Sequence, residues 1–310
     1  MTWIRALYVG ICLFALCGSG AISSSVVADE LTNYWSEYND LYKNRKYDEA
    51  LSLAKKIRIL SAAKYGNAHP EFASSLRLLA LAYEGKKFYP EAEVLLKKAL
   101  AIAENTLGKK APDVLLTLSF LSQLYQKLHR HEEAEKLLLR ILKANDNVLL
   151  SGHKPLINTL KQLILLYLKT ERYASAEPFQ KRLLAINEKH YGKDHPNVSD
   201  SLDNLALIFR LQDRYADAEP LIRRLLKNKE KKLGLSHLEV ASTLNKLAEV
   251  IEGQKNFETA VSLNKRILAI QEKNHDPFHF NIAETLNRIA SLYERLSRYS
   301  EMVRDTEHPR

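Results

Sequence analysis

Histidine is the residue type in this chain that most suggests a chemical role. Five histidines share one phase of a 42-residue interval, with Ala111 filling the gap after the first: His69, His153, His195, His237 and His279. Neutral imidazole is a common ligand of zinc, so a row of histidines is a candidate metal site. Whether these side chains can meet around one ion depends on the elements that carry them.

Other catalytic signals are weak. The segment His131 to Glu135 begins like the helix of a zinc protease, but glutamate stands where the second ligand histidine belongs. The sequence has no glycine-rich phosphate loop and no nucleophile elbow. We therefore expect a non-catalytic protein that needs no cofactor.

The elements that carry these residues are amphipathic helices. Apolar residues follow helical spacing in two adjacent stretches, first Leu202, Leu205, Ala206 and Phe209, then Ala218, Leu221, Ile222, Leu225 and Leu226. The residues between them, 212–215, are polar and too few for anything but a turn. Each period therefore predicts an antiparallel helix hairpin in an all-α protein.

One small residue keeps the same interval through the whole chain. It is alanine at six successive positions: Ala50, Ala92, Ala134, Ala176, Ala218 and Ala260. A period in this range is typical of stacked units that bury their apolar faces against one another. We expect each alanine to lie where the two helices of a hairpin cross closely. Aromatic residues mark the predicted turns, with His131 as the exception: Tyr47, Tyr89, Tyr173, Tyr215, Phe257 and Tyr299.

Stacking argues against a metal site built from the histidines. Equivalent positions in neighbouring repeats are separated by at least one helix spacing, roughly 8–10 Å. Ligands of one zinc ion lie within about 4 Å of one another. We therefore expect no bound metal. Pro70 and Pro196 suit the first turn of a helix, so the preceding histidines are expected to supply capping contacts.

The motifs of one period carry a family resemblance. Leu205-Ala206-x-x-Phe209, the segment from Tyr215 to Leu221 and the segment from Tyr191 to Pro196 together resemble the tetratricopeptide repeat in its 42-residue form, as in kinesin light chains. The resemblance covers residues 31–310. It implies a right-handed superhelical solenoid of about six hairpins plus a truncated seventh. The expected repeats are 31–66, 67–108, 109–150, 151–192, 193–234, 235–276 and a partial 277–310.

Three departures from the period are informative. The third repeat ends in 145–152 with its glycine moved two places, which predicts an irregular connection. The first unit, with Tyr34 and Tyr38 at unusual positions, is expected to act as an end cap. The last unit is expected to stop as a truncated helix with a frayed tail.

The first 28 residues have the layout of a secretory signal peptide. One positive charge, an apolar run of twelve residues and small residues follow one another, and the run is too short to span a bilayer, which needs about 20. Cleavage after Ala28 is preferred, with Ala21 as the alternative. Residues 29–310 would then form a periplasmic or secreted protein without a transmembrane segment. Acylation of Cys17 would give a lipid anchor instead, but the bulky Leu16 disfavours it.

Charge gives little information about partners. The formal net charge is +9, yet the densest basic run, 227–232, alternates with Asn228 and Glu230 on a predicted second helix. The simplest interpretation is a solvated outer face. Export and the absence of a recognition motif disfavour binding of nucleic acid.

The family resemblance also implies a binding surface. In such proteins the first helix of each hairpin lines the concave face, which places one row and its flank there: Arg77, Lys161, Asp203, Asn245 and Asn287, flanked by Asn204, Lys246 and Arg288. Asparagine amides pair well with the backbone of an extended peptide, and the cations with its acids.

Two classes of function stay open. The first is an exported scaffold that binds a peptide or protein on the concave face. The second is a structural accessory subunit of an envelope or secretion complex, which would use the outer face or the end repeats. A secreted effector has the same sequence features.

Overall fold

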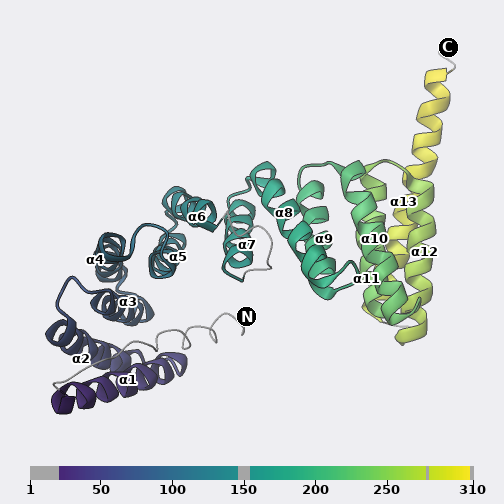
Figure 1. Cartoon of the computed structure of the whole chain (residues 1–310). Helices are drawn as coiled ribbons and strands as arrows, with labels where there is room; N and C mark the ends of the chain where they lie inside the picture. Colours follow the sequence, from purple (N-terminus) through teal and green to yellow (C-terminus); the bar gives the residue numbers. More distant parts are fainter. Residues whose placement is uncertain (1–20, 146–153, 277–278, 308–310) are drawn as a thin grey trace. The chain divides into compact units, whose positions relative to one another are not determined.

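The computed structural model describes residues 21–145, 154–276 and 279–307. These residues form thirteen α-helices and no β-strand (Figure 1). The prediction of an all-α repeat solenoid is confirmed. The irregular connection expected at 145–152 falls almost wholly outside the described residues, as do His153 and most of the expected signal peptide.

Twelve of the helices form six consecutive pairs along the chain. The pairs are α1 (Ala21–Lys43) and α2 (Tyr47–Tyr65), α3 (Pro70–Gly85) and α4 (Tyr89–Leu107), α5 (Pro112–Lys127) and α6 (His131–Asn145), α7 (Lys154–Lys169) and α8 (Tyr173–Tyr191), α9 (Pro196–Arg210) and α10 (Tyr215–Leu233), and α11 (Leu238–Gly253) and α12 (Phe257–Asn274). A single helix, α13 (Phe280–Glu307), follows them.

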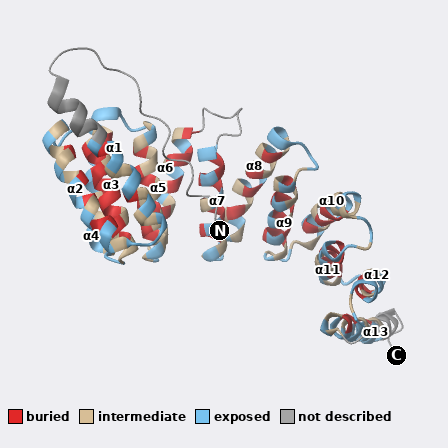
Figure 2. Cartoon of the chain, turned by 90° about the horizontal axis from the view of Figure 1, so that it is seen from below, coloured by how far each residue is buried: buried red, intermediate tan, exposed pale blue. Residues whose placement is uncertain are grey.

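The chain divides into two compact units, one up to Leu124 and one from Tyr125 onward. In the first unit, consecutive helices from α1 to α4 pack against one another, and in the second unit consecutive helices from α6 to α13 do the same. Figure 2 shows the buried residues on the faces where helices of one unit meet. The six periodic alanines are completely buried on these faces.

The turn inside each hairpin uses a left-handed residue that is not glycine. Six such residues have φ between +56° and +66°: Arg45, Lys87, His129, Glu171, Asp213 and Lys255. The next backbone N–H then donates to the carbonyl five residues earlier, as from Arg214 to Phe209 at 2.9 Å. This is a Schellman C-cap, and the sequence gives no glycine to signal it.

Two aromatic residues that follow these turns also contact the next hairpin. The ring of Tyr47 lies against Gly85 of the next hairpin, and the ring of Tyr215 lies against Gly253. A Cβ atom at Gly253 would come within 2.6 Å of the Tyr215 ring. These two aromatics therefore fix the stacking of one repeat on the next.

The turn between hairpins joins a glycine to a histidine cap. Gly66, Gly108, Gly192 and Gly234 have φ of +82° to +85° with extended ψ, a conformation nearly restricted to glycine. Three residues after Gly66, Gly192 and Gly234, histidine Nδ1 accepts the N–H of the second residue of the following helix, as at His195 (3.1 Å). Ala111 takes this place after Gly108. His69, His237 and His279 cap in the same way. The expected capping role is confirmed at these four histidines.

The last helix departs from the prediction of a turn before Tyr299. The backbone of α13 stays helical from Phe280 to Glu307 and continues through the position where the six hairpins turn. In Figure 1, the C-terminal turns of α13 extend beyond α12. Its final unit is therefore one long helix.

Candidate functional site

The candidate site is a groove on the first helices of the last two repeats, within the second unit. It has a volume of about 580 Å³ and lies between α11 and α13, with the C-terminal end of α12 at one end. Six of the residues that line it are Ser242, Asn245, Glu249, His275, Glu284 and Arg288. The predicted binding residues Asn245 and Arg288 thus meet in one groove.

Helical spacing places these side chains together. On α11, lining residues recur at Leu238, Ala241, Asn245 and Glu249, which is one face of a helix. On α13 the corresponding positions are 281, 284, 285 and 288. The apolar faces of both helices pack toward the core, so their polar faces line the groove.

Two contacts close the end of the groove. The rings of His275 and His279 stack with centroids 3.8 Å apart, and His279 also caps α13. The Thr285 hydroxyl donates to Oε1 of the buried Gln271 at 2.8 Å. These contacts hold the C-terminal end of α12 against the start of α13, and no sequence pattern indicated them.

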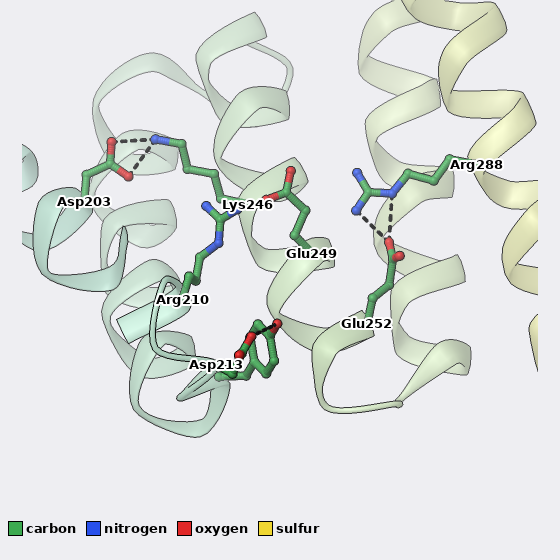
Figure 3. Close-up of polar contacts among 8 residues, drawn as sticks. Asp203, Arg210, Asp213, Lys246, Glu249, Glu252 and Arg288 are labelled. Carbon is green, nitrogen blue, oxygen red and sulfur yellow. Dashed lines mark hydrogen bonds and ion pairs between the residues drawn. The ribbon is translucent and has the colours of Figure 1, made fainter. Parts of the chain in front are cut away.

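Three of the four predicted binding cations already form ion pairs. Lys246 pairs with Asp203 of α9, with Nζ 2.6 Å from Oδ1. Arg288 reaches Glu252 of α11 through Nε at 2.8 Å and Nη2 at 2.6 Å (Figure 3). Figure 3 also shows Arg210 beside Glu249, an ion pair between α9 and α11. These side chains connect neighbouring first helices.

Arg77 lies elsewhere and is not available as a free cation. It is only 7% exposed, and its guanidinium pairs with Asp113 at 2.7 Å and bonds Ser74 at 2.8 Å. The expectation that it meets acids of a partner does not fit this burial. It instead holds α3 and α5 together within the first unit.

The remaining predicted residues keep their polar groups unused. Asn204 and Asn287 are exposed, Asn245 is half-buried, and Lys161 is exposed. Within the described parts of the chain, the side chains of these four residues form no hydrogen bond or ion pair. They are the part of the predicted set that offers free donors and acceptors.

A second set of contacts, which we did not predict, lies at the hairpin turns. Arg172 pairs with Glu135 of the preceding repeat and covers the Tyr167 ring, 4.8 Å from its centroid. Arg214 does the same with Glu177 and Phe209, at 4.5 Å from the ring. In the sequence, the constant separation of 37 residues between arginine and glutamate is the pattern that could have indicated these pairs. Such pairs join consecutive repeats.

The pKa values reflect these contacts. Burial raises the pKa of the Glu135 carboxyl, but hydrogen bonds from Arg172 and Tyr167 lower it more, so the net pKa is below the usual value of 4.5. Burial and the hydrogen bond to Glu135 raise the pKa of Tyr167 to about 12. Hydrogen bonds from Lys181 and Arg214 lower the pKa of Glu177. Ionised carboxylates are therefore part of the folded state.

The basic run 227–232 is only partly a solvated face. Lys229 is half-buried and pairs with Glu239 at 3.3 Å, and Lys231 pairs with Asp194 at 2.8 Å. Lys227 and Lys232 are exposed and form no ion pair with described residues. The prediction of a uniform outer face is wrong at Lys229, which occupies a position that is buried in other repeats.

Neither metal ligation nor membrane insertion is indicated by the described residues. Among them, no three His, Cys, Asp or Glu side chains gather in a way that would hold a metal ion. None of the helices in residues 21–145, 154–276 and 279–307 has the length and apolar character needed to cross a membrane.

Similar solved structures share the fold. A putative kinesin light chain of Podosopora anserina with nearly identical TPR-like repeats is 23% identical, with a TM-score of 0.58, covering 66% of this chain and 97% of that chain. BtubC (BKLC) from P. vanneervenii is 17% identical, with a TM-score of 0.52, covering 76% of this chain and 92% of that chain. Among curated proteins, none matches the sequence significantly.

The family model settles the relationship. The tetratricopeptide repeat model matches residues 71–147, 156–231 and 239–301, which together are well over half of the chain. These segments contain all the groove-lining residues except Leu238, five of the six hairpin turns and five of the six periodic alanines. The chain therefore belongs to the tetratricopeptide repeat family.

Proposed function

We propose that this protein is an exported, non-catalytic scaffold that binds an extended segment of a partner protein along the first helices of its second unit. Tetratricopeptide repeat proteins are generally scaffolds for protein interactions, so a protein partner is the coarse expectation. The groove between α11 and α13 offers a surface of suitable chemistry. The partner and the export step are the specific parts of the proposal.

The observation that carries the proposal is the unused amide of Asn245 inside the groove. A half-buried amide with no partner among the described residues is costly to desolvate unless a ligand bonds it. A carboxamide has one acceptor and two donors, which match the N–H and C=O groups of a peptide backbone. Asn204 repeats this chemistry on α9, at the exposed surface.

The ion pairs of the surface support recognition by shape and backbone contacts. Lys246 and Arg288 are each neutralised by a carboxylate of an adjacent first helix. Partner acids would have to displace those carboxylates. Lys161 is the one predicted cation without an ion pair among the described residues, so it is the favoured contact for an acidic side chain.

Site-specific photo-crosslinking tests the groove. A benzophenone amino acid at position 204 or 245 is expected to give a protein adduct in the native exported fraction, whereas the same probe at Lys227 or Lys232 gives none. Asn204→Ala combined with Asn245→Ala should weaken binding of the captured partner, since each lost hydrogen bond is worth about 0.5–1.5 kcal/mol. Helicity and melting should stay unchanged.

The opposite pattern supports the other function class. Adducts from Lys227 and Lys232, with none from positions 204 and 245, would show that the outer face is used. The structural accessory subunit would then replace the peptide-binding scaffold.

Export is tested by intact mass. We expect the exported protein to begin near Asp29, because the preceding segment has the layout of a signal peptide. A protein that retains residues 1–28, or one with a diacylglycerol on Cys17, would contradict that expectation.

A further inference from the structure

One carboxylate in the groove between α11 and α13 has no counter-charge. Three of the residues that line the groove are acids or strong bases: Glu249, Glu284 and Arg288. Glu249 pairs with Arg210, and Arg288 pairs with Glu252 (Figure 3). Glu284 is exposed and forms no hydrogen bond or ion pair with any residue that the structure describes. The groove therefore offers one free negative charge.

The fold takes away the partner that Glu284 would have on an isolated helix. Glutamate and arginine four residues apart are neighbours on a helix surface and commonly pair, and Arg288 lies four residues after Glu284. Arg288 instead reaches Glu252 of α11, through Nε at 2.8 Å and Nη2 at 2.6 Å. Glu252 also lies 4.0 Å from Arg295, which is outside the groove. Because Arg288 is held by α11, the Glu284 carboxylate stays unpaired.

The two histidines at the end of the groove do not supply the missing positive charge. Nδ1 of His279 accepts the backbone N–H of Asn281 at 3.2 Å, so this nitrogen carries no proton. The ring of His275 stacks on the ring of His279. Neither side chain forms an ion pair with a described residue. The counter-charge of Glu284 has to come from outside the described chain.

A buried amide in the same groove also has an unused donor. Gln271 lines the groove from the last turn of α12 and is only 6% exposed. Its Oε1 accepts the Thr285 hydroxyl at 2.8 Å, whereas its Nε2 donates to no described residue. A buried amide N–H without an acceptor is unfavourable unless a ligand supplies one. Gln271 is thus a second observation, independent of Glu284, that indicates a polar ligand in this groove.

From these contacts we propose that the groove recognises a basic residue of the partner segment, with Glu284 as the ion-pair acceptor and the amides of Asn245 and Gln271 as backbone contacts. This inference rests on the function proposed above, because both concern the same groove. A lysine or arginine can pair with Glu284 without breaking any existing contact. An acidic residue would have to displace Glu252 from Arg288 and would be repelled by Glu284. Charge complementarity therefore selects a basic segment.

The neighbouring first helices add no competing cation at this level. The positions equivalent to Glu284, at intervals of 42 residues, are Asn158, Asp200 and Ser242. Asp200 is exposed and forms no ion pair with a described residue. A segment that continues from α13 toward α9 along these positions meets a second free carboxylate. The same class of partner is favoured at both places.

Fluorescence anisotropy with two labelled, end-capped peptides tests the inference on the purified protein at about 0.15 M ionic strength. One peptide alternates glycine with arginine, and the other alternates glycine with glutamine. We expect the arginine peptide to bind at least about fivefold more tightly, because a charge-assisted hydrogen bond is stronger than a neutral one. The formal net charge of +9 opposes a basic ligand, so such a preference has to come from a local site.

Variants assign the preference to Glu284. Glu284→Gln should remove most of the difference between the two peptides, and Glu284→Lys should make the arginine peptide the weaker ligand. Glu272→Gln is the matched control, because it removes the same charge from an exposed position of α12 that does not line the groove, and it should change nothing. Circular dichroism should show the same melting curve for Glu284→Gln and the wild type.

Three results would overturn the assignment. They are an arginine peptide that binds no better than the glutamine peptide, one that binds Glu284→Gln as tightly as the wild type, and equal losses in Glu284→Gln and Glu272→Gln. Failure of the groove itself is separable from these. A partner that crosslinks from positions 204 and 245 but binds Glu284→Gln normally leaves the scaffold function standing and removes only the preference for a basic residue.

Discussion

At the scale of single residues, the backbone conformation of the hairpin turns determines which substitutions are tolerated. Lys87 is exposed and has a φ of +66°, where a side chain costs about 1–2 kcal/mol. We expect Lys87→Gly to stabilise the protein by about 0.5–1 kcal/mol, since relief of this strain exceeds the entropy that glycine adds to the unfolded state. Urea denaturation gives the measurement. Lys87→Ala keeps the strain and should give no gain.

At the Tyr215–Gly253 contact, the expected preference is reversed: glycine is favoured over alanine because of packing, even though it lies in a helix. Gly253 lies in a helix, where alanine is normally preferred by about 1 kcal/mol, but its Cβ would clash with the Tyr215 ring. Gly253→Ala should therefore destabilise the protein by about 1–3 kcal/mol. The same change in a Tyr215→Ala background should be neutral or stabilising. If Gly253→Ala costs the same in both backgrounds, the ring does not fix the repeat stacking.

At the scale of helices, the hairpin crossing is the critical packing point. Ala218 is completely buried in the core that α10 shares with α9 and α11. Ala218→Leu should cost about 1–3 kcal/mol by overpacking, measured from urea melts. Lys232→Ala, on the exposed part of α10, should change stability by less than about 0.5 kcal/mol. Lys229 would be a poor control, because it is half-buried and paired.

At the scale of the whole molecule, the ion pairs between repeats make the free energy of unfolding depend on pH. The folded pKa values of Glu135 and Glu177 lie below the ordinary 4.5, so their contribution is present above that pH and is lost as pH falls through the lowered values. Melting temperature should therefore decline below about pH 4.5. Glu177→Gln should lower stability at neutral pH and make the decline shallower. An equally steep acid decline in this variant would show that Glu177 does not contribute.

The repeats, and with them the fold, were predictable because the pattern is local. Helical periodicity and a small residue every 42 positions depend only on packing within and between neighbouring hairpins. The same pattern therefore recurs in each repeat. The histidine caps were predictable for the same reason, because Nδ1 contacts a backbone N–H two residues away. The left-handed turns were not, because non-glycine residues occupy them.

What the sequence by itself determined is therefore the series of hairpins, their core positions and the row of candidate binding residues on the first helices. Only the tertiary structure decided which of those residues remain free. Arg77, Lys246 and Arg288 find carboxylates about one repeat away, on helices whose relative rotation no local pattern specifies. Asn245 finds none. Leu286 and Tyr293 of α13 match positions that α11 buries, and only the structure shows that they are 49% and 47% exposed. The physical reason is that α13 stays helical where the equivalent segment of the preceding repeat turns.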